Sequence, residues 1–117
     1  MEIEEIIEPN ERRQHERRVL RGPSQLQFGS QPFMNTRTMD VSISGLGLVA
    51  PVNPPARTTC TVKFVVPIDT DRNVTITASA IVTHSIFTRA EDGFKVGLMF
   101  TGMSAETTAV LQRYVKR

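Results

Sequence analysis

The chain has 117 residues, of which 39% are hydrophobic and 22% are charged, with a formal net charge of +2. This length and composition fit one globular domain with its own core, and they exclude both a disordered chain and two domains. Cys60 is the single cysteine, which excludes an intramolecular disulfide and a thiolate metal cluster, so we expect a reducing compartment. An acidic start and the lack of any apolar run of about 20 residues argue against a signal peptide and a membrane span, so we expect a cytoplasmic protein.

An arm followed by a folded domain is the predicted organisation. We place the arm at residues 1–23 and the domain at residues 24–117, because Gly22-Pro23 interrupts the chain between them. Three isoleucines near the start have helical spacing, but Pro9 limits a helix there. A short helix and a disordered tail both stay open for this segment.

Charge is distributed unevenly along the predicted arm. Residues 2–11 carry five glutamates and no basic residue, whereas residues 12–21 carry five arginines and one acidic residue. Such a local basic patch suits a small anionic ligand better than a long nucleic acid, which needs a basic face across the whole domain. We therefore expect no nucleic-acid partner.

From residue 24 onward the pattern predicts strands. Residues 74–83 alternate apolar and polar side chains with a period of two, and residues 94–101 do the same. Residues 61–66 form another candidate, which Pro67 should end. Shorter candidates are residues 25–28, 37–43 and 46–50, with turns at residues 69–73 and 89–93.

The strand connections are too short for crossover helices, so the strands should pair antiparallel in a mainly β fold that closes as a barrel or sandwich. The last segment has a different pattern. Ser104 is a candidate N-cap, and the apolar residues after it recur at helical spacing. One amphipathic helix should close the domain, with Thr107, Val110, Leu111 and Tyr114 on its apolar face.

Two groups of residues have the chemistry to bind a guanine nucleotide. Arg13 and Arg17 form an Arg-x-x-x-Arg motif, and Asp40, Ser42 and Gly45 form Asp-x-Ser-x-x-Gly. A guanidinium donates to phosphate oxygens and to O6 and N7 of guanine, on whose face it also stacks. The carboxylate accepts from guanine N1–H and N2, the serine donates or accepts, and the glycine permits a close backbone approach. Taken separately, the first motif is also typical of a solvated segment and the second of a turn.

The two motifs in this order resemble the PilZ family of cyclic di-GMP receptors. The resemblance covers residue 11 to about residue 100, including the late run GFKVGLMF at residues 93–100. It implies a six-stranded antiparallel β-barrel with a C-terminal helix and an N-terminal arginine-rich arm that folds over one barrel face. It also implies that the five motif residues bind cyclic di-GMP.

Two arginines beside the first motif leave alternatives open. Arg12 is a preceding arginine that many family members also have, and it favours an intercalated ligand dimer over a single ligand. Arg18 stands where many members have an apolar residue, so a register in which Arg18 replaces Arg17 at the ligand stays open. The spacing of four favours Arg17. Arg12 and Arg18 are therefore candidate ligand-binding residues as well.

The other chemically capable residues are interpreted as structural. His15 should face solvent in the arginine loop, with stacking on a base as the alternative, while His84 ends a strand and Cys60 is a small buried hydrophobe. The sequence has no nucleophile elbow, no zinc-binding set of cysteines and histidines and no cluster of metal-binding carboxylates. We therefore expect no enzyme, no metal site and no cofactor apart from the nucleotide ligand.

The predicted function is that of a cyclic di-GMP receptor whose arm, at residues 8–22, orders on ligand binding and changes the surface offered to a partner protein. Flagellar, polysaccharide-synthesis and transcriptional machinery all fit as partners. One alternative is a PilZ-like interaction module that does not bind nucleotide, but that class loses motif residues that are retained here. The other is a nucleic-acid-binding barrel, which needs exposed aromatic residues, whereas this chain has no Trp, one Tyr and six Phe mostly at core positions.

Overall fold

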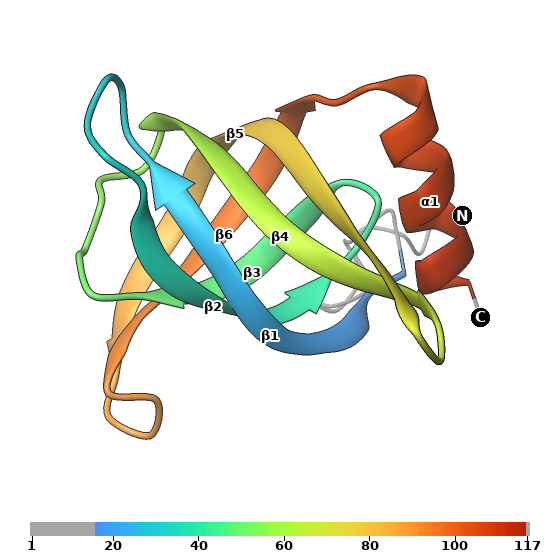
Figure 1. Cartoon of the computed structure of the whole chain (residues 1–117). Coiled ribbons are helices and arrows are strands. Elements are labelled where there is room, and N and C mark those ends of the chain that lie inside the picture. Colours follow the sequence, from blue (N-terminus) through green and yellow to red (C-terminus); the bar gives the residue numbers. More distant parts are fainter. Residues whose placement is uncertain (1–15, 117) are drawn as a thin grey trace, which may run out of the picture.

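Alternating apolar and polar side chains build six strands in the computed structural model, which describes residues 16–116 (Figure 1). Around the closed barrel the strand order is β1-β2-β3-β6-β5-β4, and each neighbouring pair is antiparallel. This confirms the predicted mainly β barrel. The strands are β1 (Arg18–Gln27), β2 (Met34–Val41), β3 (Gly45–Ala50), β4 (Thr59–Asp69), β5 (Arg72–Thr88) and β6 (Gly93–Gly102).

The inward-facing residues of the strands form the core. In β5 the predicted alternation is confirmed, because every second residue is buried from Ile76 to Val82. In β4 the inward set includes Phe64, whose ring stacks on Phe100 at 5.9 Å between centroids. Cys60 lies in the same set and is buried, as expected of a small hydrophobe, and this burial raises its pKa to about 11.

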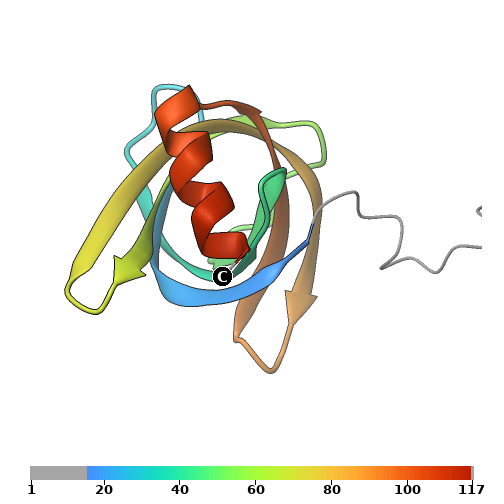
Figure 2. The same ribbon diagram turned by 90° about the vertical axis from the view of Figure 1, so that its right-hand side faces the viewer.

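The helix α1 (Ala105–Val115) lies across one open end of the barrel (Figure 2). Ser104 is its N-cap, and the Ser104 hydroxyl accepts a hydrogen bond from the backbone N–H of Thr107 at 3.1 Å. The side chains of Leu111, Tyr114 and Val115 are buried among the residues of the barrel core. The predicted amphipathic helix is therefore confirmed, and its apolar face closes the barrel.

The first strand starts earlier than the sequence pattern predicted. We expected it at residues 25–28, but β1 begins at Arg18, and Leu20 is buried in the core. Gly22-Pro23 does not interrupt the strand, because a register shift lies between Val19 and Gly22 and because pairing with β4 starts only at Ser24. Residues 18–23 therefore belong to β1, while residues 1–15 of the predicted arm lie outside the described residues.

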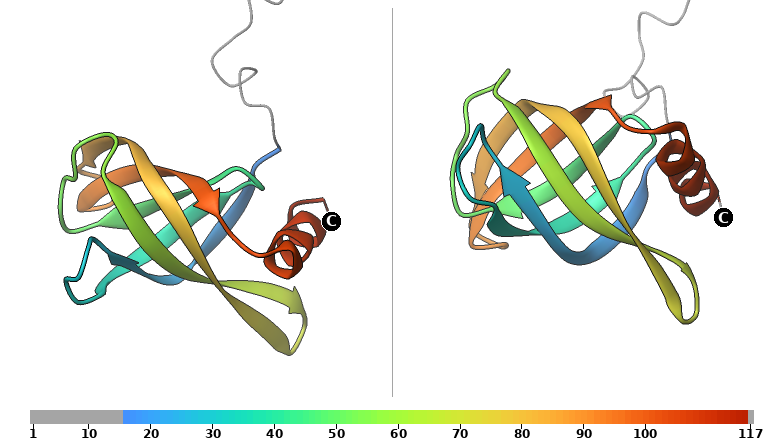
Figure 3. Two further views of the ribbon diagram at one scale, coloured as in Figure 1. Left: turned by 90° about the horizontal axis from the view of Figure 1, so that it is seen from above. Right: turned by 45° about the horizontal axis from the view of Figure 1, so that its top comes forward.

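Pro67 does not end β4, which continues to Asp69. At this point β4 pairs with β5 alone and has a register shift, and proline is tolerated at such irregular edge positions. The β4–β5 and β5–β6 hairpins project from opposite ends of the barrel (Figures 1 and 3). Within residues 16–116 no helix has the length and apolar character needed to cross a membrane.

Candidate functional site

A row of four residues crosses four strands on the outside of the barrel. Asp40 of β2 pairs with Gly47 of β3, Gly47 pairs with Gly97 of β6, and Gly97 pairs with His84 of β5. The row faces outward, because side chains alternate along a strand and the adjacent row faces the core. That adjacent row is Val41, Leu46, Leu98 and Val82.

Two glycines in the middle of this row form a floor without side chains, which we call the glycine floor. A Cβ atom on Gly47 would lie 2.5 Å from Asp40 Oδ1, and a Cβ atom on Gly97 would lie 2.2 Å from His84 Cε1. The carboxylate and the imidazole therefore lean over the floor from its two sides. Only glycine leaves the space that these two side chains occupy.

The side chain of Arg17 reaches this row. Its Nη1 donates to Asp40 Oδ1 at 3.2 Å, and both side chains are partly exposed, at 25% and 29%. Arg17 immediately precedes β1, whose Val19 pairs with Asp40, so the strand pairing brings them together. The structure thus joins one residue of each predicted motif in one contact, in which the carboxylate and guanidinium stay accessible to a ligand.

Ser42 and Gly45 shape the turn between β2 and β3. The buried Ser42 hydroxyl accepts from the backbone N–H of Ser44 and from that of Gly45, both at 3.1 Å, and the Ser42 N–H donates to the Gly45 carbonyl at 2.8 Å. A Cβ atom on Gly45 would lie 2.3 Å from the backbone oxygen of Leu98. These two motif residues fix the turn that follows Asp40, and ligand contact by them stays a prediction.

Arg18 points away from Arg17, toward the helix. Its Nη1 donates to the Tyr114 carbonyl at 2.7 Å, and its guanidinium lies 4.2 Å from the centre of the Tyr114 ring. The Tyr114 hydroxyl in turn donates to the carbonyl of Val19 at 2.9 Å. Successive residues of an extended chain face opposite sides. Of the two registers that the sequence left open, this geometry favours Arg17 at the ligand, while Arg12, Arg13 and His15 lie outside the described residues.

Two further residues border the site without having been predicted. His84 was expected only to end a strand, and Lys95 was noted only within the late β6 run. Together with Arg17, Asp40, Val96 and the glycine floor they line a hollow of about 70 Å³. The register of β5 on β6, with its shift between Val82 and His84, brings them there, and no local sequence signal encodes that register.

The hollow is too small for a ligand of dinucleotide size, so such a ligand would lie on the surface above it. A larger hollow of about 270 Å³ lies over β1 and β4, where it has one cation, Lys63, and neither motif. In the part of the chain that the structure describes, no three His, Cys, Asp or Glu side chains gather closely enough to hold a metal ion. The row of Asp40, Gly47, Gly97 and His84 therefore remains the best-defined candidate for anion and base recognition.

A protein-family model described as PilZ domain matches residues 11–117 of the chain. Curated proteins provide no sequence match. Among solved structures, the inhibitor of motility MotI/DgrA of Bacillus subtilis is similar, with a TM-score of 0.75 and 18% identity over 90% of this chain and 50% of that chain.

The PilZ domain with c-di-GMP of YcgR from Escherichia coli has a TM-score of 0.60 and 15% identity over 90% of this chain and 89% of that domain. A tetrameric PilZ domain protein of Xanthomonas campestris has a TM-score of 0.50 and 18% identity over 76% of this chain and 47% of that chain. The chain thus spans about half the length of two of these proteins. At these identities the likeness of the structures concerns the fold.

Proposed function

This chain belongs to the PilZ domain family, a family of cyclic di-GMP receptors, and we propose that it binds cyclic di-GMP over the glycine floor. The contact between Arg17 and Asp40 carries the proposal, because it brings both predicted motifs together on one accessible surface. The YcgR domain, whose structure contains c-di-GMP, has the same fold and supports this ligand.

The chemistry of the row suits a guanine base. The Asp40 carboxylate accepts from N1–H and N2 of guanine, and Arg17 donates to O6 and N7 or stacks on the base. The Asp40 and His84 side chains occupy the space above Gly47 and Gly97, so a planar ring approaches this backbone closely when the two side chains swing aside. His84 at the far side offers a ring for stacking.

Phosphate groups need cations around the same surface. Lys95 lines the hollow beside the glycine floor, and it offers a point charge to a phosphate oxygen. The family resemblance also assigns Arg13 of the motif and the preceding Arg12 to the ligand. We propose that these arginines close over the nucleotide from the N-terminal side, and that Arg12 favours an intercalated dimer of the ligand.

The proposed mechanism is a change of order in the segment that precedes β1. Residues 18–22 of the predicted segment belong to β1. The proposed change therefore concerns residues 8–17, most of which lie outside the described residues. Ordering of the three arginines of this segment, Arg12, Arg13 and Arg17, on the ligand would present a new surface to a partner protein. A motility protein is one candidate partner, since MotI is named an inhibitor of motility.

Calorimetric titration with cyclic di-GMP, cyclic di-AMP and GTP tests the proposal. We expect cyclic di-GMP to bind most tightly and Arg17→Ala to weaken it by about thirtyfold, since charge-assisted hydrogen bonds contribute on the order of 2 kcal/mol. Arg72→Ala is the matched control, because Arg72 makes a similar ion pair with Asp69 at 2.9 Å in the β4–β5 hairpin, outside the candidate site. Absence of binding by the parent protein would overturn the proposal and favour an interaction module that ignores nucleotide.

A further inference from the structure

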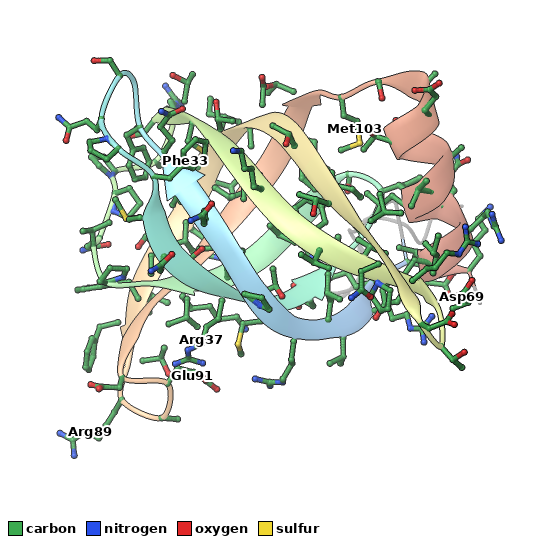
Figure 4. All side chains as sticks on the ribbon, in the orientation of Figure 1. Phe33, Arg37, Asp69, Arg89, Glu91 and Met103 are labelled. Carbon is green, nitrogen blue, oxygen red and sulfur yellow. The ribbon has the colours of Figure 1, made fainter. Side chains whose placement is uncertain are left out.

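Three cations surround one carboxylate beside the glycine floor. Arg37 Nη1 lies 2.7 Å from Glu91 Oε1, and Arg21 Nη1 lies 4.0 Å from Glu91 Oε2. The hydrogen bond from Arg37 and the charges of Arg37, Arg21 and Lys95 lower the pKa of Glu91. Figure 4 shows Arg37 and Glu91 pointing toward each other below the barrel. One carboxylate does not neutralise three cations, so Arg21, Arg37 and Lys95 form a patch with excess positive charge, here called the basic patch.

Exposed apolar side chains lie beside the basic patch and across the glycine floor from it. Ile86 is 63% exposed and pairs with Lys95, which places both side chains on the same outer face. Met99, which is 48% exposed, lies on that face on the other side of Gly97, two residues along β6. Large exposed aliphatic residues next to unneutralised cations fit a partner that is acidic and aliphatic at once.

Residues 2–11 of this chain have that composition. They contain five glutamates, three isoleucines and no basic residue. Five residues separate residue 11 from Arg17 at the site, and the six steps of extended chain between them reach about 20 Å. Asp40 and His84 are three strand spacings apart, or about 15 Å, so the segment is long enough to cross the face.

We propose that residues 2–11 dock on the basic patch and cover the glycine floor when no nucleotide is bound. Their glutamates pair with Arg21, Arg37 and Lys95, and their isoleucines contact Ile86 and Met99. Exposed ion pairs are individually weak and screened by salt, so the docking is partial and salt-sensitive. As a consequence, this acidic segment and cyclic di-GMP exclude each other, and this consequence rests on the proposed function.

Amide chemical shifts of the nucleotide-free chain test the docking. The double variant Glu5→Gln/Glu8→Gln should shift the resonances of Ile86 and Lys95, because it removes two charges of the segment. Asp71→Asn/Glu106→Gln is the matched control, since it removes two exposed charges from the β4–β5 hairpin and from α1. In about 1 M salt, where the Debye length is about 3 Å, the parent spectrum at these residues should approach that of the first variant.

Identical spectra of the first double variant and the control at the basic patch would overturn the docking. A shift that grows with protein concentration would also overturn it, because the segment of a second copy would then be the occupant. Neither result depends on nucleotide, so a failure of the proposed receptor function stays distinguishable from a failure of this inference.

Calorimetry on the same variants tests the mutual exclusion. Glu5→Gln/Glu8→Gln should bind cyclic di-GMP about threefold to tenfold more tightly than the parent. When residues 2–11 cover the site for part of the time, the apparent affinity for the nucleotide equals the intrinsic affinity multiplied by the fraction of sites that are uncovered. The control double variant should bind like the parent. Equal affinity of both double variants, together with the expected shifts in the free protein, would overturn the exclusion while the docking stands.

Discussion

Substituting alanine for glycine should have opposite effects at the glycine floor and at the β2–β3 turn. At Gly97 the new methyl group would meet His84 Cε1 at 2.2 Å, which is the end of an exposed side chain that can rotate away. At Gly45 it would meet the backbone oxygen of Leu98 at 2.3 Å, and there a strand must move. The first change should disturb the site and the second should disturb the fold.

The size of each change in unfolding free energy depends on whether a side chain or a strand has to move. Gly97→Ala should alter the free energy of unfolding by less than about 1 kcal/mol, because only the exposed His84 side chain above the buried Gly97 has to move. Gly45→Ala overpacks a buried position and should cost about 1–3 kcal/mol. For a domain of this size, each 1 kcal/mol lowers the melting temperature by about 4 °C.

Thermal unfolding followed by circular dichroism, together with calorimetric titration, separates the two effects. Gly97→Ala should melt like the parent and bind cyclic di-GMP at least about tenfold more weakly, a loss of about 1.4 kcal/mol. Gly102→Ala is a control on the same strand, because its Cβ would find its nearest neighbour, Ser79 Cβ, at an ordinary 3.8 Å. Parent-like binding by Gly97→Ala, or parent-like melting of Gly45→Ala, would refute the reasoning.

Four further outcomes are expected. Arg13→Ala should weaken cyclic di-GMP binding by on the order of 2 kcal/mol in calorimetry with little change in melting temperature, because it removes a charge-assisted contact. In competition assays Asp40→Ala should narrow the preference for cyclic di-GMP over cyclic di-AMP, since adenine lacks the donor edge that the carboxylate reads. Tyr114→Phe should lower unfolding stability by about 1 kcal/mol in denaturant titration, because the hydrogen bond from the tyrosine hydroxyl to the Val19 carbonyl is lost. Burial raises the pKa of the Cys60 thiol from 9.0 to about 11, so the folded protein holds this proton more tightly than the unfolded chain does. The resulting contribution to the free energy of unfolding should be complete below pH 9 and decrease between pH 9 and pH 11. Alkylation at pH 8 should label Cys60 only on unfolding.

Much of the fold was predictable, because strands with one buried face impose a period of two on the sequence. Residues 74–83 show that period clearly, and they lie within β5. The start of β1 was not predictable in the same way, since Gly22-Pro23 is normally a turn signal. Its place in a strand depends on a register shift and on where pairing with β4 begins, and both arise only when the barrel closes.

The site was predictable where its residues are close in sequence. Asp40 and Ser42 belong to one short motif, whose turn the structure shows in hydrogen-bonded detail. His84 and Lys95 come from strands that lie far along the chain from Asp40. Their approach depends on the register shift after Val82, which no periodicity of β5 alone reveals.

The most direct test of the central claim is a nuclear Overhauser measurement on the complex with cyclic di-GMP. The glycine floor should show contacts between protons of the nucleotide and the Hα protons of Gly47 and Gly97, with further contacts to the His84 ring. Contacts to the β1–β4 surface around Lys63, with none to Gly47 or Gly97, would contradict the account.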